Sequence, residues 1–434
     1  MRARTYVAAS VVLALGGLGL AACGGDSSGG GGGGGGGKVT MTLWHNATTG
    51  PGVAFWQKAV KDFQAAHPTV TIKIQAIQNE DLDGKLQTAL NAGSGPDLFL
   101  QRGGGKMAAM VKAGQVMDIT DAVTPATRQA VGASAVAAEQ IGGKTYAIPI
   151  AVLPGGFWYS QDVFTKAGIT GTPATLADLQ ADLTKLKGVP GIAPIALGGK
   201  DAWPAAHYYY FFALRECSAD TITSNATSLA FDDPCWLKAG QRLQDFVASK
   251  PFNAGFLTTS AQQGAGSSAG LLANHKAAME LMGAWDPGVI GSLTPNQKPL
   301  PDLGWFPFPD IPGGGGKPGS ILGGVDGYSC SARAPKPACT DFLNFLDTTP
   351  VQEAYYTAFQ APPVNTQAQG VVTEPYLTSV MTAFNKAPFV SQWLDTEYGQ
   401  SVGNALNTAV VNLMAGKGGP QDIVTAAKNA AKKA

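Results

Sequence analysis

The fold is decided by the stretch KVTMTLWHNATTGPGVAFWQKAVKDFQAAHPTVTIKIQAIQNEDLDGKLQTALNAGSGPDLFL, residues 38–100. Residues 38–44 alternate between apolar and polar side chains, which is typical of a strand with one buried face. Residues 53–66 carry apolar side chains at helical spacing, and Pro68 ends that helix because the residue before a proline disfavours helical backbone. A strand followed at once by an amphipathic helix indicates an α/β fold.

The remainder of the stretch repeats this pattern. A strand, a helix and a short buried strand are predicted at residues 70–77, 81–92 and 96–100, and a glycine loop at residues 103–105 leads into the next helix. The order strand–helix–strand–helix–strand predicts right-handed crossovers and a largely parallel sheet.

A second α/β pattern follows residue 150, and 434 residues are too many for one ordinary core, so two lobes are expected. The predicted elements are strands at residues 146–150 and 192–197, a helix at residues 176–186 that starts at Thr175, a mobile glycine loop at residues 313–316, and helices in residues 402–431 that are broken at residues 416–420.

The composition argues against charged partners. Charged residues make up 14% of the chain, whereas about 25% is usual, and the net charge is zero. Without residues 1–22, which contain two arginines and no acid, 28 Lys+Arg stand against 30 Asp+Glu. This balance offers no electrostatic footprint for nucleic acid or anionic lipid, so we expect a neutral ligand.

The N-terminus is typical of an exported protein. A short basic region precedes the apolar residues 7–20, and Leu20-Ala21-Ala22-Cys23 resembles the lipobox of bacterial lipoproteins. Lipidation of Cys23 would place the protein at the outer face of the cytoplasmic membrane, and the glycine-rich residues 24–37 would form a flexible tether. The alternative is an ordinary signal peptide with an incidental cysteine.

Four further cysteines form an even set in an oxidising compartment. Their order suggests the pairs Cys217–Cys235 and Cys330–Cys339, although four cysteines allow three pairings and free buried thiols are an alternative. A metal site is not expected, because the chain has no C-x-x-C motif and its histidines are scattered.

Several motifs in order resemble the extracellular solute-binding proteins of carbohydrate ABC importers, of the maltodextrin-binding type. They are Val39-Thr-Met-Thr-Leu-Trp-His-Asn46, Leu86-Gln-Thr-Ala-Leu-Asn-Ala-Gly-Ser-Gly-Pro-Asp-Leu98, Lys144-Thr-Tyr-Ala-Ile-Pro149, Ala278-Met-Glu-Leu-Met-Gly-Ala-Trp285 and Gly323-Gly-Val-Asp-Gly-Tyr-Ser329. The resemblance covers nearly the whole mature chain. Each motif is weak alone, and their shared order carries the resemblance.

The resemblance implies two α/β lobes that are joined by hinge strands and hold a ligand in the cleft between them. Lobe one would comprise residues 38–149 and 322–361, and lobe two residues 150–321 and 362–434. It also implies a monomer without cofactor or catalytic activity that delivers a sugar to membrane permease subunits and meets the membrane only through its anchor.

A narrower resemblance concerns the ligand. Ala196-Leu-Gly-Gly-Lys-Asp-Ala-Trp-Pro-Ala-Ala-His207 is similar to actinobacterial binding proteins for plant-derived oligosaccharides, which implies xylobiose or short xylo-oligosaccharides. Gln101-Arg102 departs from the maltodextrin type, which carries an aromatic residue there, and this puts maltodextrin in doubt.

Tryptophans at strand ends predict the faces of a sugar site. Trp44, Trp203 and Trp285 end a predicted strand or lie in a loop beside one, where open α/β sheets bind ligands. An indole plane suits the C–H face of a sugar ring, and such contacts are worth about 0.5–1.5 kcal/mol beyond area burial. The alternative for each is a place in the core.

The hydroxyl rim of a sugar favours planar polar side chains that make two hydrogen bonds each. The candidates are Asn46, Glu80, Asp81, Arg102, Asp201, Asp286, Asp326 and, as a cleft-facing aromatic, Tyr328. Asp81 could instead cap a helix, Asp286 could serve the turn before Pro287, and Tyr328 could belong to the core.

Two other functions stay open. Paired carboxylates could in principle hydrolyse a glycosidic bond, which would make the protein a secreted glycoside-acting enzyme. The glycine loop at residues 103–105 lacks the Lys-Ser/Thr of a P-loop. A binding protein for another solute class, such as peptides, metals or anions, is the second alternative.

Overall fold

The structure is a computed structural model that describes residues 37–433, apart from the side chains of residues 133 and 134. The predicted signal peptide, the lipidated Cys23 and the glycine tether before residue 37 lie outside the described residues. Within the described range, no helix is long and apolar enough to cross a membrane.

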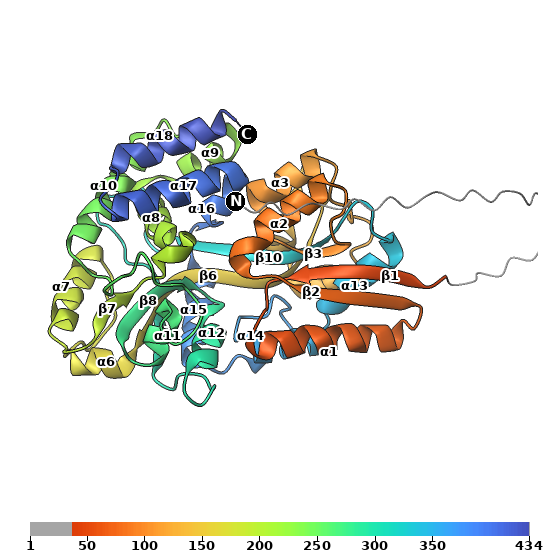
Figure 1. Cartoon of the computed structure of the whole chain (residues 1–434), viewed down its shortest axis with the longest axis horizontal. Helices are drawn as coiled ribbons and strands as arrows, with labels where there is room; N and C mark the ends of the chain where they lie inside the picture. The colour runs from red at the N-terminus through yellow and green to blue at the C-terminus, as the bar shows by residue number, and fades with distance from the viewer. Residues whose placement is uncertain (1–36, 434) are drawn as a thin grey trace, which may run out of the picture. The chain divides into compact units, whose positions relative to one another are not determined.

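The deciding stretch folds as predicted. Strands β1 (Val39–His45), β2 (Val70–Ala76) and β3 (Leu98–Gln101) pair in parallel around β1. Helices α1 (Gly50–Ala66) and α2 (Asn79–Asn91) connect them. Figure 1 shows α1 on one side of these strands and α2 on the other, as right-handed crossovers require.

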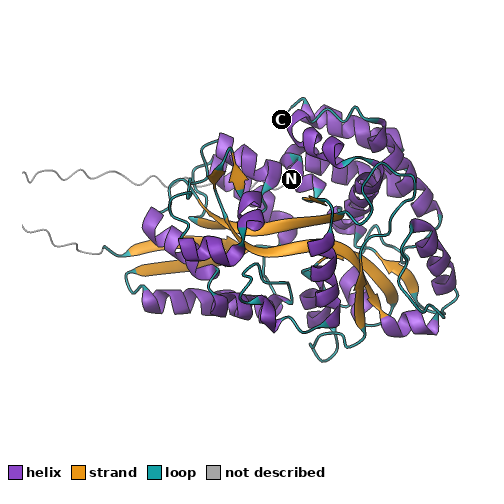
Figure 2. Cartoon of the chain, turned by 180° about the vertical axis from the view of Figure 1, so that it is seen from behind, coloured by secondary structure: helices purple, strands orange, loops and turns teal. Residues whose placement is uncertain are grey.

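Two long strands run through the middle of the sheet, β6 (Ile148–Ser160) and β10 (Ile321–Cys330). The order is β2-β1-β3-β10-β6-β8-β7, with β9 (Leu303–Phe306) on β6 and β11 (Val390–Ser391) on β10. Figures 1 and 2 show β6 and β10 passing from the β1–β3 side to the β7–β8 side.

The sheet is mixed, so the prediction of a largely parallel sheet is wrong. β10 is antiparallel to both β3 and β6, and β6 is antiparallel to β8 (Ala277–Gly283). The parallel pairs are β1 with β2 and β3, β7 (Ala193–Ala196) with β8, and β10 with β11. The early crossovers were readable from the sequence, but the return of β10 across the sheet is a long-range event.

The second α/β pattern also forms. Helix α7 (Leu176–Lys187) begins at the predicted Thr175, whose side chain and that of Asp178 form a capping box. The other helices and short strands are α3 (Gly104–Lys112), α4 (Pro125–Val131), α5 (Ala133–Ala138), β4 (Gln140–Ile141), β5 (Lys144–Thr145), α6 (Gln161–Lys166), η1 (Gly199–Asp201), α8 (Trp203–Glu216), α9 (Ala219–Ser228), α10 (Pro234–Ala248), α11 (Ser268–Ala273), α12 (Asp286–Leu293), α13 (Lys336–Leu346), α14 (Thr349–Phe359), η2 (Gln369–Val371), α15 (Pro375–Lys386), α16 (Leu394–Glu397), α17 (Gly399–Met414) and α18 (Pro420–Ala431).

Two large hydrophobic clusters divide residues 38–433 into the two predicted lobes. In lobe one, α1, α13 and α14 pack on β1–β3 around Phe63 and Trp56. In lobe two, α7, α8, α10, α17 and α18 pack around β7 and β8, with Tyr208 and Phe212 fully buried. β6 and β10 contribute to both clusters, so they join the lobes; the residue boundaries given above remain a prediction.

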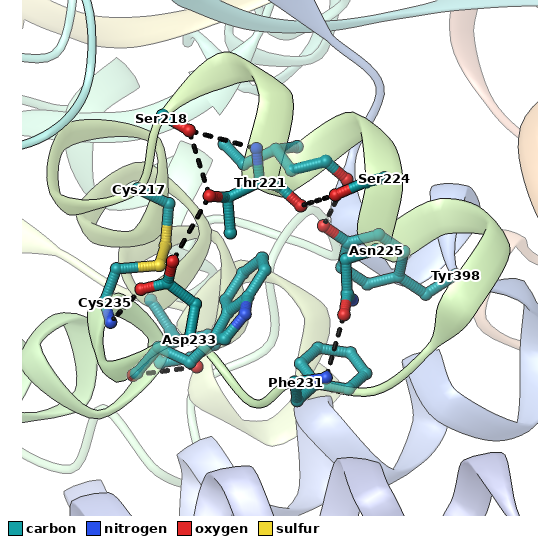
Figure 3. Close-up of a disulfide and its surroundings, with 12 residues drawn as sticks. Cys217, Ser218, Thr221, Ser224, Asn225, Phe231, Asp233, Cys235 and Tyr398 are labelled. Carbon is teal, nitrogen blue, oxygen red and sulfur yellow. Dashed lines mark hydrogen bonds between the residues drawn. A yellow bond between two sulfur atoms is a disulfide. The ribbon is translucent and has the colours of Figure 1, made fainter.

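Both predicted disulfides are present. Cys217–Cys235 joins the end of α8 to the first turn of α10, and Cys330–Cys339 joins the end of β10 to α13. Figure 3 shows the first of these beside the helix caps Ser218 and Asp233, whose side chains accept hydrogen bonds from the first turns of α9 and α10.

The glycine loop at residues 313–316 differs from its prediction. Gly315 N and Gly316 N donate to the carbonyl oxygens of Glu216 and Arg215 at 3.2 and 2.9 Å. A Cβ on Gly314 or Gly316 would collide with backbone oxygens at the end of α8. The glycines therefore serve close packing of two backbones, not mobility.

Candidate functional site

A polar cluster gathers at the carboxyl ends of the lobe-one strands. This lobe-one polar cluster consists of Asn46, Asn79, Asp83, Arg102, Lys106 and Asp326. Asn46 follows β1, Arg102 follows β3, and Asp326 lies on β10 where the register with β6 shifts. A register irregularity of this kind is a common way to re-aim a side chain beside a site.

Arg102 holds the cluster together. Its Nη2 donates to Asn79 Oδ1 at 2.6 Å, its Nε lies 3.3 Å from Asp83 Oδ1 and its Nη1 lies 3.5 Å from Asp326 Oδ2. Asn46 Nδ2 donates to the same Asn79 oxygen at 3.1 Å. Three predicted site residues, Asn46, Arg102 and Asp326, are therefore brought together, through Asn79.

The charges of this cluster are strongly coupled. Burial would raise the pKa of Asp83, but Lys106 and Arg102 outweigh it and hold that pKa far below its usual value. The pKa of Asp326 is raised, because burial outweighs the nearby Arg102. The anionic form of Asp326 is thus less stabilised than that of Asp83.

Lobe two contributes aromatic rings. We call Trp203, His207, Trp285 and Trp393 the lobe-two aromatic cluster. The Trp203 and Trp285 rings are 6.1 Å apart at 60°, and Trp285 and Trp393 are 5.8 Å apart. His207 stacks on Trp393 at 4.0 Å, and burial lowers the pKa of His207 to about 4, so the imidazole is neutral.

Local structure positions the two predicted tryptophans. Trp203 starts α8 directly after Ala202, which has a left-handed backbone with φ 64°. Trp285 follows β8, and its ring lies against Gly283, where a Cβ would collide with the indole. Trp285 is only partly buried and touches the cores of both lobes, as a platform between lobes would. The Trp203 Nε1 atom is buried and lies near the Glu80 carboxyl group.

The start of α2 in lobe one faces the start of α8 in lobe two. Burial raises the pKa of Glu80, Asp201 raises it further and the Trp203 indole lowers it, so these three side chains lie near one another. Gln263 Nε2 donates to Gln78 Oε1 at 3.3 Å across the same gap. Asp201 also accepts a 2.7 Å hydrogen bond from Ala261 N, which ties η1 to the following loop.

Four predicted site residues lie elsewhere. Asp81 is exposed in the first turn of α2 and pairs with Lys85 at 3.0 Å, and the N-cap is Gln78. Trp44 packs partly buried against the cluster beneath α2 and α3. For these two, a role in binding stays a prediction that the geometry does not support.

Asp286 and Tyr328 were predicted to face the ligand, but the structure buries both. Asp286 is fully buried beside Glu280, and burial raises the pKa of both carboxyls. Tyr328 is 2% exposed and packs 4.8 Å from the Trp56 ring in the lobe-one core. Asp286 is the first residue of α12, so strand alternation does not apply to it. Tyr328 lies on β10 two residues after Asp326, and the register shift between Asp326 and Gly327 interrupts the alternation that would place both on one face.

Sequence reasoning missed several members of the site. Asn79, Asp83 and Lys106 belong to the lobe-one polar cluster. A loop far along the chain adds Gln392, whose Nε2 donates to Arg102 O at 2.9 Å, and Trp393, which joins the lobe-two aromatic cluster. Asp83 and Lys106 flank the predicted Arg102 on neighbouring helices, which could have suggested them. Nothing local marks the loop at residue 392.

The described residues also contain two hollows and one group of side chains that could in principle hold a metal ion. A cavity of about 30 Å³ beside Arg102 is lined by Asp83, Gln101, Lys106 and Gln400, and a groove of about 580 Å³ lies between α17 and α18. Asp162, His275 and Asp302 offer ligand atoms within 4.8 Å of one another. Asp302 already accepts from Ser160 and the Asp162 N–H and lies 3.0 Å from His275 Nε2, so this group works as a structural network.

Comparison with known proteins identifies the family. Residues 46–353, more than half of the chain, match the family described as "Bacterial extracellular solute-binding protein". The chain belongs to this family. It is 26% identical over 323 residues to an uncharacterized ABC transporter extracellular-binding protein of Pyrococcus horikoshii, covering 73% of this chain and 69% of that protein. It is 28% identical over 185 residues to a putative binding protein of Brucella abortus, covering 42% and 44%.

Solved structures with the same fold include other solute-binding proteins. One from work on xylan utilization by Caldanaerobius polysaccharolyticus has a TM-score of 0.82 and 23% identity, covering 90% of this chain and 99% of that one. A chitin oligosaccharide binding protein has a TM-score of 0.81 and 23% identity, covering 92% and 99%. These likenesses establish the two-lobe α/β fold. Membership of the family makes this chain an extracellular solute-binding protein.

Proposed function

We propose that this extracellular solute-binding protein captures a short neutral oligosaccharide between its lobes and delivers it to an ABC importer without reacting with it. The observation that carries the proposal is the pairing of opposite surfaces: Trp203 and Trp285 on lobe two, and the lobe-one polar cluster around Arg102. The named relatives support it, since they include an ABC transporter binding protein and proteins from chitin oligosaccharide and xylan systems.

The chemistry of a sugar matches these two surfaces. Indole planes cover the C–H faces of a pyranose ring, and Asn46, Arg102 and Asp326 can each make two directed hydrogen bonds to its hydroxyls. The net charge of zero agrees with an uncharged solute. A peptide or anion receptor would need a spare charge, whereas Arg102 is already paired with Asp83 and Asp326.

Binding would require both lobes. Neither the aromatic nor the polar cluster alone surrounds a sugar, and the lobes are joined by β6 and β10, which can act as hinge strands. Closure on the ligand would also be the signal that importer permease subunits recognise, because the liganded form presents both lobes in one geometry. An affinity of about 1 μM, or about −8 kcal/mol, would allow both capture and release.

For the sugar itself we propose xylobiose or a short xylo-oligosaccharide. The segment Ala196–His207, which contains Asp201 and Trp203, supports this choice, together with the xylan context of the structure with a TM-score of 0.82. The decisive measurement is calorimetry with xylobiose, xylotriose, cellobiose and maltose, followed by analysis of the recovered ligand. Intact ligand supports a binding protein, and cleaved ligand would establish a glycoside-acting enzyme instead.

The variant Trp285→Ala tests the platform directly. We expect binding to weaken by more than 1 kcal/mol, roughly tenfold, with little change in the free energy of unfolding, because Trp285 is only partly buried. The control is Trp236→Phe in the lobe-two core, which should lower stability and keep the affinity. Unchanged sugar binding by Trp285→Ala would contradict the platform role. Binding of a peptide or ion in place of any sugar would overturn the proposed function.

We further propose a monomer that is anchored through lipidated Cys23, with the glycine tether leading to the folded lobes. The supporting observation is the Leu20-Ala21-Ala22-Cys23 motif followed by glycines. Cys23→Ser, or globomycin treatment, should release the protein from membranes into the soluble fraction. Retention of the serine variant in the membrane fraction would argue against the anchor.

A further inference from the structure

Glu139 is a buried acid whose carboxyl group lacks hydrogen-bond partners, a property that among the described residues it shares with Asp286, which lies beside Glu280. It follows α5, its exposed fraction is 0%, and neither carboxyl oxygen has a hydrogen-bond partner among the described residues. The buried Glu280 and Asp347, by contrast, accept hydrogen bonds from Ser268 and Gln352. Buried polar groups are nearly always paired, so an unpaired carboxyl needs an explanation.

The carboxyl of Glu139 lies directly beside the lobe-one polar cluster. One oxygen is 3.0 Å from where a Cβ of Gly327 would lie, next to Asp326. The other is 3.7 Å from the equivalent point on Gly103, next to Arg102, and Gln392 Nε2 is 3.8 Å from that same point. Both neighbours are glycines, so no side chain separates the carboxyl from the turns that carry these site residues.

An unpaired buried acid makes the free protein less stable. Burial, and then the charge of Asp326, raise the pKa of Glu139 well above its usual value, which favours the protonated carboxyl, a group with one donor and free acceptor capacity. Proteins keep such unfavourable groups chiefly at functional sites, where a ligand supplies the missing partner.

We propose that Glu139 is a further ligand-recognition residue, whose carboxyl group exchanges a hydrogen bond with a hydroxyl of the bound sugar on the hinge side of Arg102 and Asp326. This inference rests on the proposed sugar-binding function and adds a contact that the aromatic and polar clusters do not contain. Glu139 is enclosed in this structure. Its contact with the sugar would therefore form during lobe movement, when the ligand takes the place of the backbone at Gly103 and Gly327 beside the carboxyl group.

The test is a pair of Glu139 variants. Glu139→Leu removes the hydrogen bond at similar size and should raise or preserve the melting temperature of the ligand-free protein, while weakening binding of the best sugar in the xylobiose, xylotriose, cellobiose and maltose panel at least tenfold. Glu139→Gln keeps a donor and an acceptor and should stay within about threefold of wild type. If Glu139→Leu does not fold, Glu139→Met takes its place.

A matched control is Asp347→Asn, at a buried acid that is already hydrogen bonded to Gln352 and should leave affinity unchanged. Unchanged sugar affinity in Glu139→Leu would overturn the inference, whatever the melting temperature of the variant. A bound water would then be the hydrogen-bond partner of the carboxyl group. An equal loss in Glu139→Gln and Glu139→Leu would also overturn it. Failure of the wild type to bind any sugar would overturn the proposed function, and this inference with it.

Discussion

The lobe-one polar cluster and the lobe-two aromatic cluster, which we propose to share one ligand site, are built on opposite principles. The polar cluster depends on one cation: Arg102 contacts Asn79, Asp83 and Asp326. The aromatic cluster spreads its contacts over four rings, each of which has at least two ring neighbours. Loss of one member should therefore collapse the first cluster and only weaken the second.

The variant Arg102→Met tests most directly whether the lobe-one polar cluster depends on its single cation. Asp326 would lose its ion-pair partner while it remains about 18% exposed, so we expect the free energy of unfolding to fall by about 3 kcal/mol and sugar binding to be lost. Chemical denaturation and calorimetry measure both effects. The matched control is Lys85→Met, which removes an exposed ion pair and should cost less than about 0.5 kcal/mol. A loss below about 1 kcal/mol for Arg102→Met would show that the cluster does not depend on its cation.

The disulfides extend the comparison to the stability of the lobes. Cys217–Cys235 spans 18 residues in lobe two and Cys330–Cys339 spans 9 residues in lobe one. Loop-closure entropy predicts that replacing either pair with serine costs about 3 kcal/mol, with the longer loop costing about 0.5 kcal/mol more. Denaturation of the two double-serine variants would check this order, and a larger loss for the shorter loop would point to native-state packing as the main effect.

Each lobe also contains one buried histidine, His45 in lobe one and His207 in lobe two. Burial lowers the pKa of each to about 4, below the unfolded value of 6.5. The unfolded chain therefore binds more protons between these values, and stability is fully present above pH 6.5 and falls as the pH drops toward 4. Each histidine should lower the free energy of unfolding by about 2 kcal/mol at pH 5 relative to pH 7.

The measurement compares unfolding of His45→Gln, His207→Phe and wild type at pH 7 and pH 5. His207→Phe keeps a ring that can stack on Trp393. His45→Gln retains a side-chain acceptor for Ala47 N, which donates to His45 Nδ1 at 3.1 Å in the wild type. Each variant should lose less stability on acidification than wild type does. An unchanged pH dependence in either variant would mean that its histidine is protonated in the folded state.

The smallest expected effect concerns a single ring of the aromatic cluster. Trp203→Phe keeps an aromatic plane and removes only the indole N–H, which lies near Glu80, so sugar affinity should fall only about threefold. Trp203→Ala should cost about tenfold, because the plane itself is lost. Calorimetry with the same sugar distinguishes the two. Equal losses would show that the N–H, and not the plane, makes the contact.

Much of the fold was predictable because its signals are local. The alternation in residues 38–44, the helical spacing in residues 53–66 and the cap at Thr175 are properties of neighbouring residues. The direction of β10 was not predictable in this way, since its pairing with β3 joins residues more than two hundred positions apart. The loop at residues 313–316 was mispredicted because glycine permits close packing as well as mobility.

The sequence by itself determined the alternating strands and helices and the neutral charge balance, and it led us to predict an export signal and to choose Trp203, Trp285, Arg102 and Asp326 as candidates. Only the tertiary structure decided which side chains meet: it buries Asp286 and Tyr328, and brings Gln392 to Arg102 and Glu139 beside Asp326. The physical reason is that local periodicity sets which face of an element is apolar, whereas burial and hydrogen bonding are set by elements distant in the chain, packed against that face.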